Sequence, residues 1–240
     1  MEVSKYGELA AESYWMRRAY GFSSCAARFR TKHQAPNTRH QTPNTDSLKP
    51  AKLALIPTLV GLNLVVAWIA ASIKLPVFLD SIGITLGAIL AGPMIAVIIG
   101  VATCLLGSVM LVPSYWAFSG TATAIGLMSY LFAKYGFYVK WWKAVIAGLI
   151  IALVSASVSA PVSFYLTGGS TGGGVDALTV LFHAAGNSIL KSVFLSGFSS
   201  EPVDKVITSL AAWFLAHSLS RRTLAWFPGA EARIKGTPQA

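Results

Sequence analysis

The sequence predicts an all-α protein built as a polytopic membrane bundle of six transmembrane helices. Hydrophobic residues make up 54% of the 240-residue chain, charged residues make up 12%, and the mean hydropathy is +0.60. These values are far more apolar than those of a typical soluble domain. Residues 75–112 are apolar almost throughout, with Asp80 as their only acidic or basic residue. The chain has 19 Lys and Arg against 9 Asp and Glu, and the basic residues gather in the tails and one short loop, as expected of cytoplasmic segments.

Residues 75–112 predict two helices. Gly92-Pro93 divides the run, because proline lacks the backbone donor that a helix interior needs and disfavours helix at the residue before it. We therefore expect a short helix at 79–91, a turn, and a longer helix ending near residue 111. Gly83, Gly87 and Ala91 fall on one face of the short helix, where small residues allow close helix packing.

Four further spans are expected, at about 53–73, 116–133, 142–166 and 200–222. Pro57 should kink the first of these near its cytoplasmic end. In the fifth span of the chain, small residues recur at every fourth position from Ala144 to Ala160, which predicts close packing against another helix of this chain or of a partner. Serines become frequent towards its far end, at Ser155, Ser157, Ser159 and Ser163, which indicates either a cavity there or hydrogen bonds between helices.

The last span is expected to begin at Ser200, because Ser can cap a helix and Pro202 is tolerated in the first turn. The preceding segment, 176–198, is ambiguous. A seventh span there would place the C-terminus outside, whereas six spans place every basic segment inside. We therefore expect a partly inserted helix on the outer side, with His183, Asn187 and Lys191 on one face.

The remaining chain is assigned to tails. Residues 1–50 form a basic cytoplasmic tail that we expect to be disordered, although a surface helix at 8–29 or a start codon assigned too early are alternatives. Residues 51–222 form the membrane domain, and 223–240 a cytoplasmic C-terminal tail. No signal-peptide pattern is present. Cys25 and Cys104 have no metal-binding or disulfide spacing, and we expect neither a metal nor a cofactor. The placement of the basic residues argues against nucleic-acid binding.

Polar residues within or beside the spans are the candidates for ligand binding. Asn63 lies mid-span, where it either bonds a neighbouring helix or contacts a ligand. Asp80, followed by Ser81, is expected to act as a helix N-cap, with a ligand role as the alternative. Asp204 and Lys205 are adjacent and are expected to neutralise each other or Asp80.

The glycine-rich segment TGGSTGGG, residues 167–174, was compared with a phosphate-binding loop. Gly169 and Gly174 have the required spacing, but Val175 stands where that motif needs lysine. The segment gives no evidence of nucleotide binding and is expected to be a mobile lid or a plain linker.

Three stretches, taken in order, carry a family resemblance: LPVFLDSIGITLGAILAGP, YLTGGSTGGGVD and EPVDKVITSLAAWFL. Together with the polar-ended fifth span and the six-span topology, they resemble an S component of an energy-coupling factor (ECF) transporter. The resemblance covers about residues 53–222. It implies a small subunit of the cell membrane that captures a vitamin or related micronutrient from outside and topples in the membrane. Its partners would be a transmembrane coupling subunit and two cytoplasmic ATPases.

The chain itself has no Walker A motif, so any ATP-driven uptake needs such partners. The resemblance also implies an Ala-xxx-Ala contact for the coupling subunit near the cytoplasmic end of the first span. Ala54 and Thr58 keep the small-residue spacing there, with Pro57 between them. Ala67 and Ala71 have the strict spacing but lie nearer the outer end.

The expected site residues lie near the outer side, where aromatic rings could stack on a planar ligand and polar groups could orient it. They are Asn63, Asp80, Tyr115, Trp116, Tyr165, His183, Asn187, Asp204 and Lys205. The substrate stays open among cobalamin, another vitamin and a nucleoside-like compound. A self-sufficient secondary carrier is one alternative, although no internal repeat is evident. A membrane enzyme is a weaker one, because no HExxH motif, carboxylate cluster or nucleophile elbow is present, and we expect no enzymatic activity.

Overall fold

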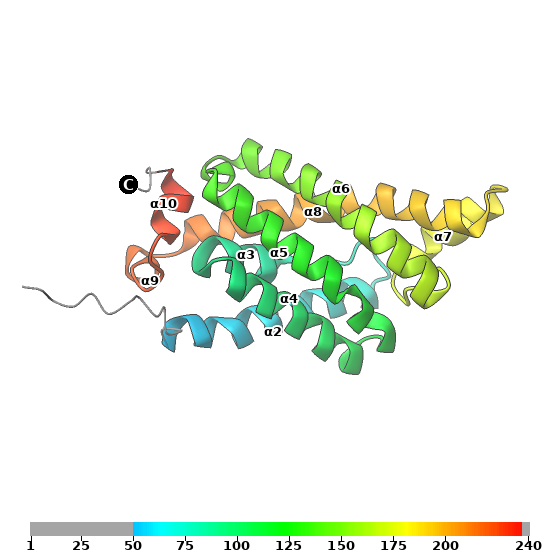
Figure 1. The fold of residues 1–240 in the computed structure, drawn as a ribbon, viewed down its shortest axis with the longest axis horizontal. Helices are drawn as coiled ribbons and strands as arrows, with labels where there is room; N and C mark the ends of the chain where they lie inside the picture. Colours follow the sequence, from blue (N-terminus) through cyan, green and yellow to red (C-terminus); the bar gives the residue numbers. More distant parts are fainter. Residues whose placement is uncertain (1–49, 237–240) are drawn as a thin grey trace, which may run out of the picture. The chain divides into compact units, whose positions relative to one another are not determined.

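The computed structural model describes residues 50–236, which are helical with no strand among them (Figure 1). The expected disordered tail at 1–50 falls almost entirely outside this range. The main helices are α2 (Pro50–Ser72), α3 (Ile82–Ala91), α4 (Pro93–Met110), α5 (Ser119–Lys134), α6 (Trp141–Thr167), α7 (Val175–Ala184) and α8 (Ile189–Ser218). Two 3₁₀ turns, η1 (Pro113–Phe118) and η2 (Phe137–Val139), and two short helices, α9 (Arg221–Leu224) and α10 (Ala230–Lys235), complete the described part.

Three of the described helices are long and apolar enough to cross a membrane. They are α2, α4 and α6, with mean hydropathies of 2.2 to 2.3 over their best windows. The predicted all-α membrane architecture is therefore supported, but the predicted count of six spans is not. Helix α3 has 10 residues, about 15 Å at 1.5 Å per residue, which is half the thickness of a bilayer core. Helix α5 has 16 residues, and α8 is long but carries three charged residues near its middle.

The predicted division at Gly92-Pro93 is confirmed. Gly92 adopts a φ of +100°, a left-handed conformation that favours glycine, and Pro93 is the first residue of α4. Gly83 lies against α2, since a Cβ there would come within 2.4 Å of the Leu59 carbonyl oxygen. The small-residue face of α3 therefore packs as predicted, and residues 82–90 of this helix are buried.

Helices α6 and α8 pack along each other, as Figure 1 shows. The small-residue stripe of α6 is buried from Ala144 to Ala160, and a Cβ on Gly148 would come within 2.7 Å of the Lys205 carbonyl oxygen of α8. The predicted close packing of this stripe is confirmed, and its partner is a helix of the same chain.

The prediction of a single helix over 176–198 is wrong. The segment is not one helix, because α7 ends at Ala184 and a turn leads into α8 at Ile189. The Ser188 side chain caps α8 by accepting from the Lys191 amide. His183, Asn187 and Lys191 consequently share no helix face: they lie in α7, in the turn and in α8.

Helix α8 also begins earlier than predicted. It starts at Ile189 instead of Ser200 and continues through Pro202. Proline removes one backbone donor from a helix, but packing on both sides of Pro202 holds the helix together. Before it, the Ser196 hydroxyl bonds that of Thr179 in α7 at 2.7 Å, and after it, α8 lies against Gly148 of α6.

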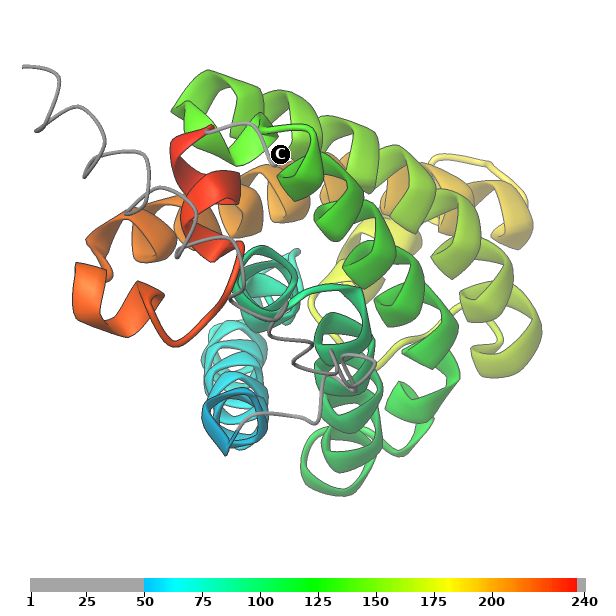
Figure 2. The same ribbon diagram turned by 60° about the vertical axis from the view of Figure 1, so that its left-hand side comes forward.

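The basic segments gather at one end of the bundle. The 134–143 connection between α5 and α6, which contains η2, lies against α10. In Figure 2, α10 is the red helix that follows the orange end of α8. Arg233 of α10 donates to the Ile89 and Ala88 carbonyl oxygens, at 2.5 Å and 3.3 Å, where α3 ends. Phe227, Ala230 and Ile234 are buried, so residues 223–236 pack onto the bundle.

Candidate functional site

A cavity lies between the helices on the side of the bundle away from these basic segments. The space between its walls that no atom fills is about 800 Å³, part of which is open to solvent. Residues from α3 to α8 and from the loops beside them form its walls. Hydroxyl side chains are prominent among them: Thr121, Ser155, Ser159, Ser163, Thr171, Thr179, Ser196 and Ser200. The predicted cavity at the serine-rich end of α6 is therefore present.

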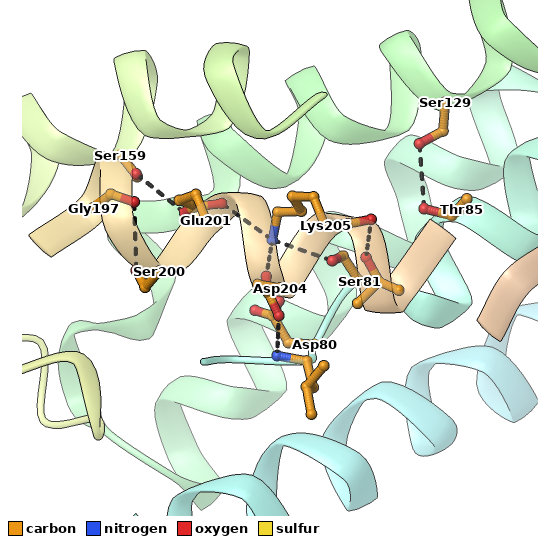
Figure 3. Close-up of polar contacts among 12 residues, drawn as sticks. Asp80, Ser81, Thr85, Ser129, Ser159, Gly197, Ser200, Glu201, Asp204 and Lys205 are labelled. Atoms are coloured by element: carbon orange, nitrogen blue, oxygen red, sulfur yellow. Dashed lines mark hydrogen bonds and ion pairs between the residues drawn. The ribbon is translucent and has the colours of Figure 1, made fainter. Parts of the chain in front are cut away.

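A cluster of charged residues on α8 reaches this cavity (Figure 3). The Lys205 ammonium forms an ion pair with the Asp204 carboxylate and lies 3.4 Å from Glu201 Oε2. It also donates to the Ser81 hydroxyl at 3.3 Å. All four residues are buried. The predicted pairing of Asp204 with Lys205 is confirmed, and Glu201 joins it one helical turn earlier.

The loop before α3 is drawn towards this cluster. The Leu79 amide donates to Asp204 Oδ1 at 2.6 Å, and Leu79 has a φ of +53°, which is uncommon for a residue other than glycine. The Tyr115 hydroxyl donates to Asp80 Oδ2 at 2.6 Å. Burial first, and then the neighbouring Asp80 carboxylate, raise the pKa of the Tyr115 phenol, so Tyr115 remains a donor.

The prediction that Asp80 caps a helix is wrong. Ser81 occupies the N-cap position of α3, and no side chain accepts a capping hydrogen bond there. Asp80 instead lines the cavity with Tyr115. Their 2.6 Å bond joins residues 35 positions apart in sequence, so local pattern could not have revealed it.

Three buried polar atoms of residues that line the cavity lack a hydrogen bond of good geometry: Thr121 Oγ1, Ser155 Oγ and Glu201 Oε2. The Ser155 hydroxyl lies beside the Glu201 carboxylate. The other carboxylate oxygen of Glu201 accepts from Ser159 at 3.4 Å. The 3.4 Å approach of Lys205 to Glu201 Oε2 is an ion pair without hydrogen-bond geometry. Buried polar groups are ordinarily paired, and leaving one unpaired costs about 1–3 kcal/mol. Water or a polar ligand in the cavity can supply the missing partner of each atom.

The glycine-rich loop forms part of the cavity wall through Gly169 and Thr171. The Asp176 carboxylate holds this loop by accepting from the Ser170 hydroxyl, from the amide and hydroxyl of Thr171, and from the Gly172 amide, all at 2.7–2.8 Å. The segment is therefore a structured cover over one side of the cavity.

The nine residues expected to bind substrate do not all come together. Asp80, Tyr115 and Lys205 line the cavity, and Asp204 lies directly behind Lys205. Asn63 is fully buried between helices: its carbonyl accepts from the Gly83 amide at 2.6 Å, and its amide donates to the Thr103 hydroxyl at 3.1 Å.

The other four lie outside the cavity lining. Trp116 and Tyr165 are exposed. Asn187 lies in the turn between α7 and α8, where its amide donates to the Phe182 carbonyl at 2.9 Å and its own carbonyl lies 2.9 Å from His183 Nδ1.

Glu201 and Thr121 were not predicted as members of the site, and Ser155 was predicted only as part of the polar end of α6. A separate helix was expected to begin at Ser200, although the spacing of four residues between Glu201 and Lys205 could have identified the pair. Within the described residues, no group of three His, Cys, Asp or Glu side chains is arranged to hold a metal ion. Comparison of the chain with protein families, curated proteins and solved structures found no match.

Proposed function

We propose that this protein is the substrate-capturing subunit of an ATP-driven micronutrient transporter, energised by a separate membrane coupling subunit and two cytoplasmic ATPases. The observation that carries the proposal is the cavity with its unpartnered buried polar atoms. A ligand site built among apolar helices suits a protein that takes a polar solute out of water at the membrane.

The distribution of charge supports the direction of capture. The 134–143 loop and the segment after Arg221 are basic and lie at the same end of the bundle. By the positive-inside rule this end is cytoplasmic, which makes the cavity accessible from outside. We extend the proposal to the topology: the protein belongs to the cell membrane, with both termini in the cytoplasm.

The proposed contact with the coupling subunit is at the start of α2. Ala54 and Thr58 are exposed, and the Thr58 hydroxyl donates to the Ala54 carbonyl at 3.1 Å. Because this bond occupies the hydroxyl within the helix, the surface offers a small, smooth face despite Pro57. Such a face lets a second helix approach closely.

The test is an affinity pulldown of the tagged full chain from mild-detergent membranes of its native host, followed by mass spectrometry of proteins and small molecules. The proposal expects a membrane coupling subunit and two ATPases, with Thr58→Leu reducing their recovery. The matched control is Leu53→Phe, an exposed position of the same helix. Recovery of the protein alone would argue against the proposal.

A self-sufficient secondary carrier is the second candidate, and one observation favours it. Glu201, Asp204 and Lys205 lie near the middle of α8, and buried charges at mid-membrane are typical of ion-coupled carriers. Purified protein in liposomes without ATPases decides between the two functions. Solute uptake driven by an ion gradient would support the carrier, whereas uptake only with the ATPase partners supports the capturing subunit.

A further inference from the structure

We infer that the cavity binds a small organic cation, such as a protonated amine or an amidinium, with its positive charge facing Glu201. The inference rests on the proposed function and narrows its substrate class. Three independent features of the cavity support it: its balance of charge, its unpartnered atoms and its aromatic wall.

The charges of the site are unbalanced. Asp80, Glu201 and Asp204 supply three carboxylates around the single ammonium of Lys205. Among the described residues that line the cavity, Lys205 is the only one with a basic side chain. With all four groups ionised, the cluster has a formal excess of two negative charges. Burial makes this excess costly unless a bound cation or a proton on one of the carboxylates relieves it.

The positions of the charges indicate where the added charge would bind. Lys205 lies closest to Asp204, and the Tyr115 hydroxyl donates to Asp80. Glu201 is the least satisfied of the three carboxylates, because its Oε2 atom has only the 3.4 Å approach of Lys205 and no hydrogen bond. An N–H donor at this atom would form a charge-assisted hydrogen bond, which is about twice as strong as a neutral one.

The unpartnered hydroxyls fit the same ligand. Ser155 of α6, which lies beside Glu201, and Thr121 of α5 are buried without a hydrogen bond of good geometry. Each hydroxyl can accept an N–H as well as donate an O–H. A cation with several N–H groups can donate to Glu201 and to a hydroxyl together. An anion would instead meet two carboxylates in the lining, Asp80 and Glu201, against one ammonium.

An aromatic wall completes the site. Phe78, Tyr115 and Phe118 line the cavity together with the charged residues. Ring faces attract cations and stack on flat groups, and the attraction is stronger where water is excluded. These rings favour a flat cation, in which the charged group is attached to or part of a ring.

The test uses three ring-matched probes that differ in charge: benzamidinium, benzamide and benzoate. Their binding to the purified full chain in nanodiscs is measured by isothermal titration calorimetry and by the shift in Tm. The inference expects benzamidinium to bind at least tenfold more tightly than benzamide, and benzoate not to bind. Equal binding of benzamidinium and benzamide, preferential binding of benzoate, or no binding of benzamidinium at millimolar concentration would each overturn it.

The second part of the test is the Glu201→Gln variant, which keeps the shape of the side chain and removes its charge. We expect it to weaken benzamidinium binding at least tenfold. Glu231→Gln is the matched control, because Glu231 lies on α10 and pairs with Lys235 at 2.5 Å, away from the cavity lining. Unchanged affinity for benzamidinium in Glu201→Gln would overturn the role of Glu201. If this variant does not fold, Ser155→Ala tests the hydroxyl beside Glu201, and unchanged affinity there would likewise count against the inference.

The outcomes separate this inference from the proposed function. If a coupling subunit and ATPases co-purify but the cavity does not prefer benzamidinium, the transport function is supported and the cation inference is refuted. If the protein binds benzamidinium selectively but purifies alone and drives uptake without ATPases, the cation inference is supported and the ATP-driven function is refuted.

Discussion

Replacing Lys205 with methionine should strongly destabilise the protein. Methionine fills a similar volume but leaves Asp204 and Glu201 buried without their cation. At the 3.4 Å distance between Lys205 Nζ and Glu201 Oε2, the attraction is about 5 kcal/mol with an effective dielectric constant of about 20. Desolvation opposes this attraction. The expected loss in the free energy of unfolding is therefore about 3–5 kcal/mol, which is typical when one partner of a buried ion pair is removed.

The assay is thermal unfolding of the purified protein in one fixed detergent. A loss of about 3 kcal/mol corresponds to a Tm lower by about 10 °C for a chain of this size. Lys191→Met is the matched control, because Lys191 lies on the same helix but is exposed, and its Tm should change by less than about 2 °C.

A compensating variant separates the lost charge from lost packing. Asp204→Asn combined with Lys205→Met removes one charge of each sign, and asparagine can still accept the hydrogen bond from the Leu79 amide. We expect this double variant to recover at least half of the lost Tm, because the two residues act as a pair. If the Lys205→Met variant has the same Tm as the Lys191→Met control, the assignment of Lys205 as the stabilising cation of the cluster is refuted.

Three further substitutions and one control test the packing that positions the site. Gly148→Ala should lower the Tm by several degrees, because a Cβ there would lie within 2.7 Å of the α8 backbone. Gly61→Ala is its control: a Cβ at Gly61 meets no atom within 4 Å, so the Tm should stay the same or rise. Asn63→Ala leaves an α3 amide and an α4 hydroxyl without their partner and should cost about 1–3 kcal/mol by thermal unfolding. Arg233→Ala removes the bonds to the end of α3 and should speed limited proteolysis of the C-terminal segment, whereas unchanged cleavage would contradict this anchoring.

Local and strictly periodic signals in the sequence predicted the structure correctly. Gly92-Pro93 ends one helix and begins the next because the required backbone geometry belongs to those two residues. The stripe from Ala144 to Ala160 indicates a packing face because a spacing of four residues repeats along one side of a helix. Such features need no knowledge of what the neighbouring helix is.

Prediction from the sequence failed where the deciding contact is distant in sequence. Ser200, Glu201 and Pro202 form a good helix-start pattern, yet α8 continues through them because its earlier part packs against α7. Asp80 satisfies a capping pattern, yet its carboxylate accepts from Tyr115, 35 residues further on. In both cases tertiary packing outweighs a local preference worth about 1 kcal/mol.

Helix α8 shows why the span count and the site are linked. Its composition departs from that of a membrane span because Glu201, Asp204 and Lys205 fall near its middle, and those same residues build the charged wall of the cavity. Their cost in an apolar setting is offset locally by ion pairs and by the Ser81 and Ser159 hydroxyls. A sequence that places such charges where apolar residues would be more stable indicates a site under functional constraint. The helix that fits the membrane pattern least is therefore the one on which the proposed capture of a cation depends.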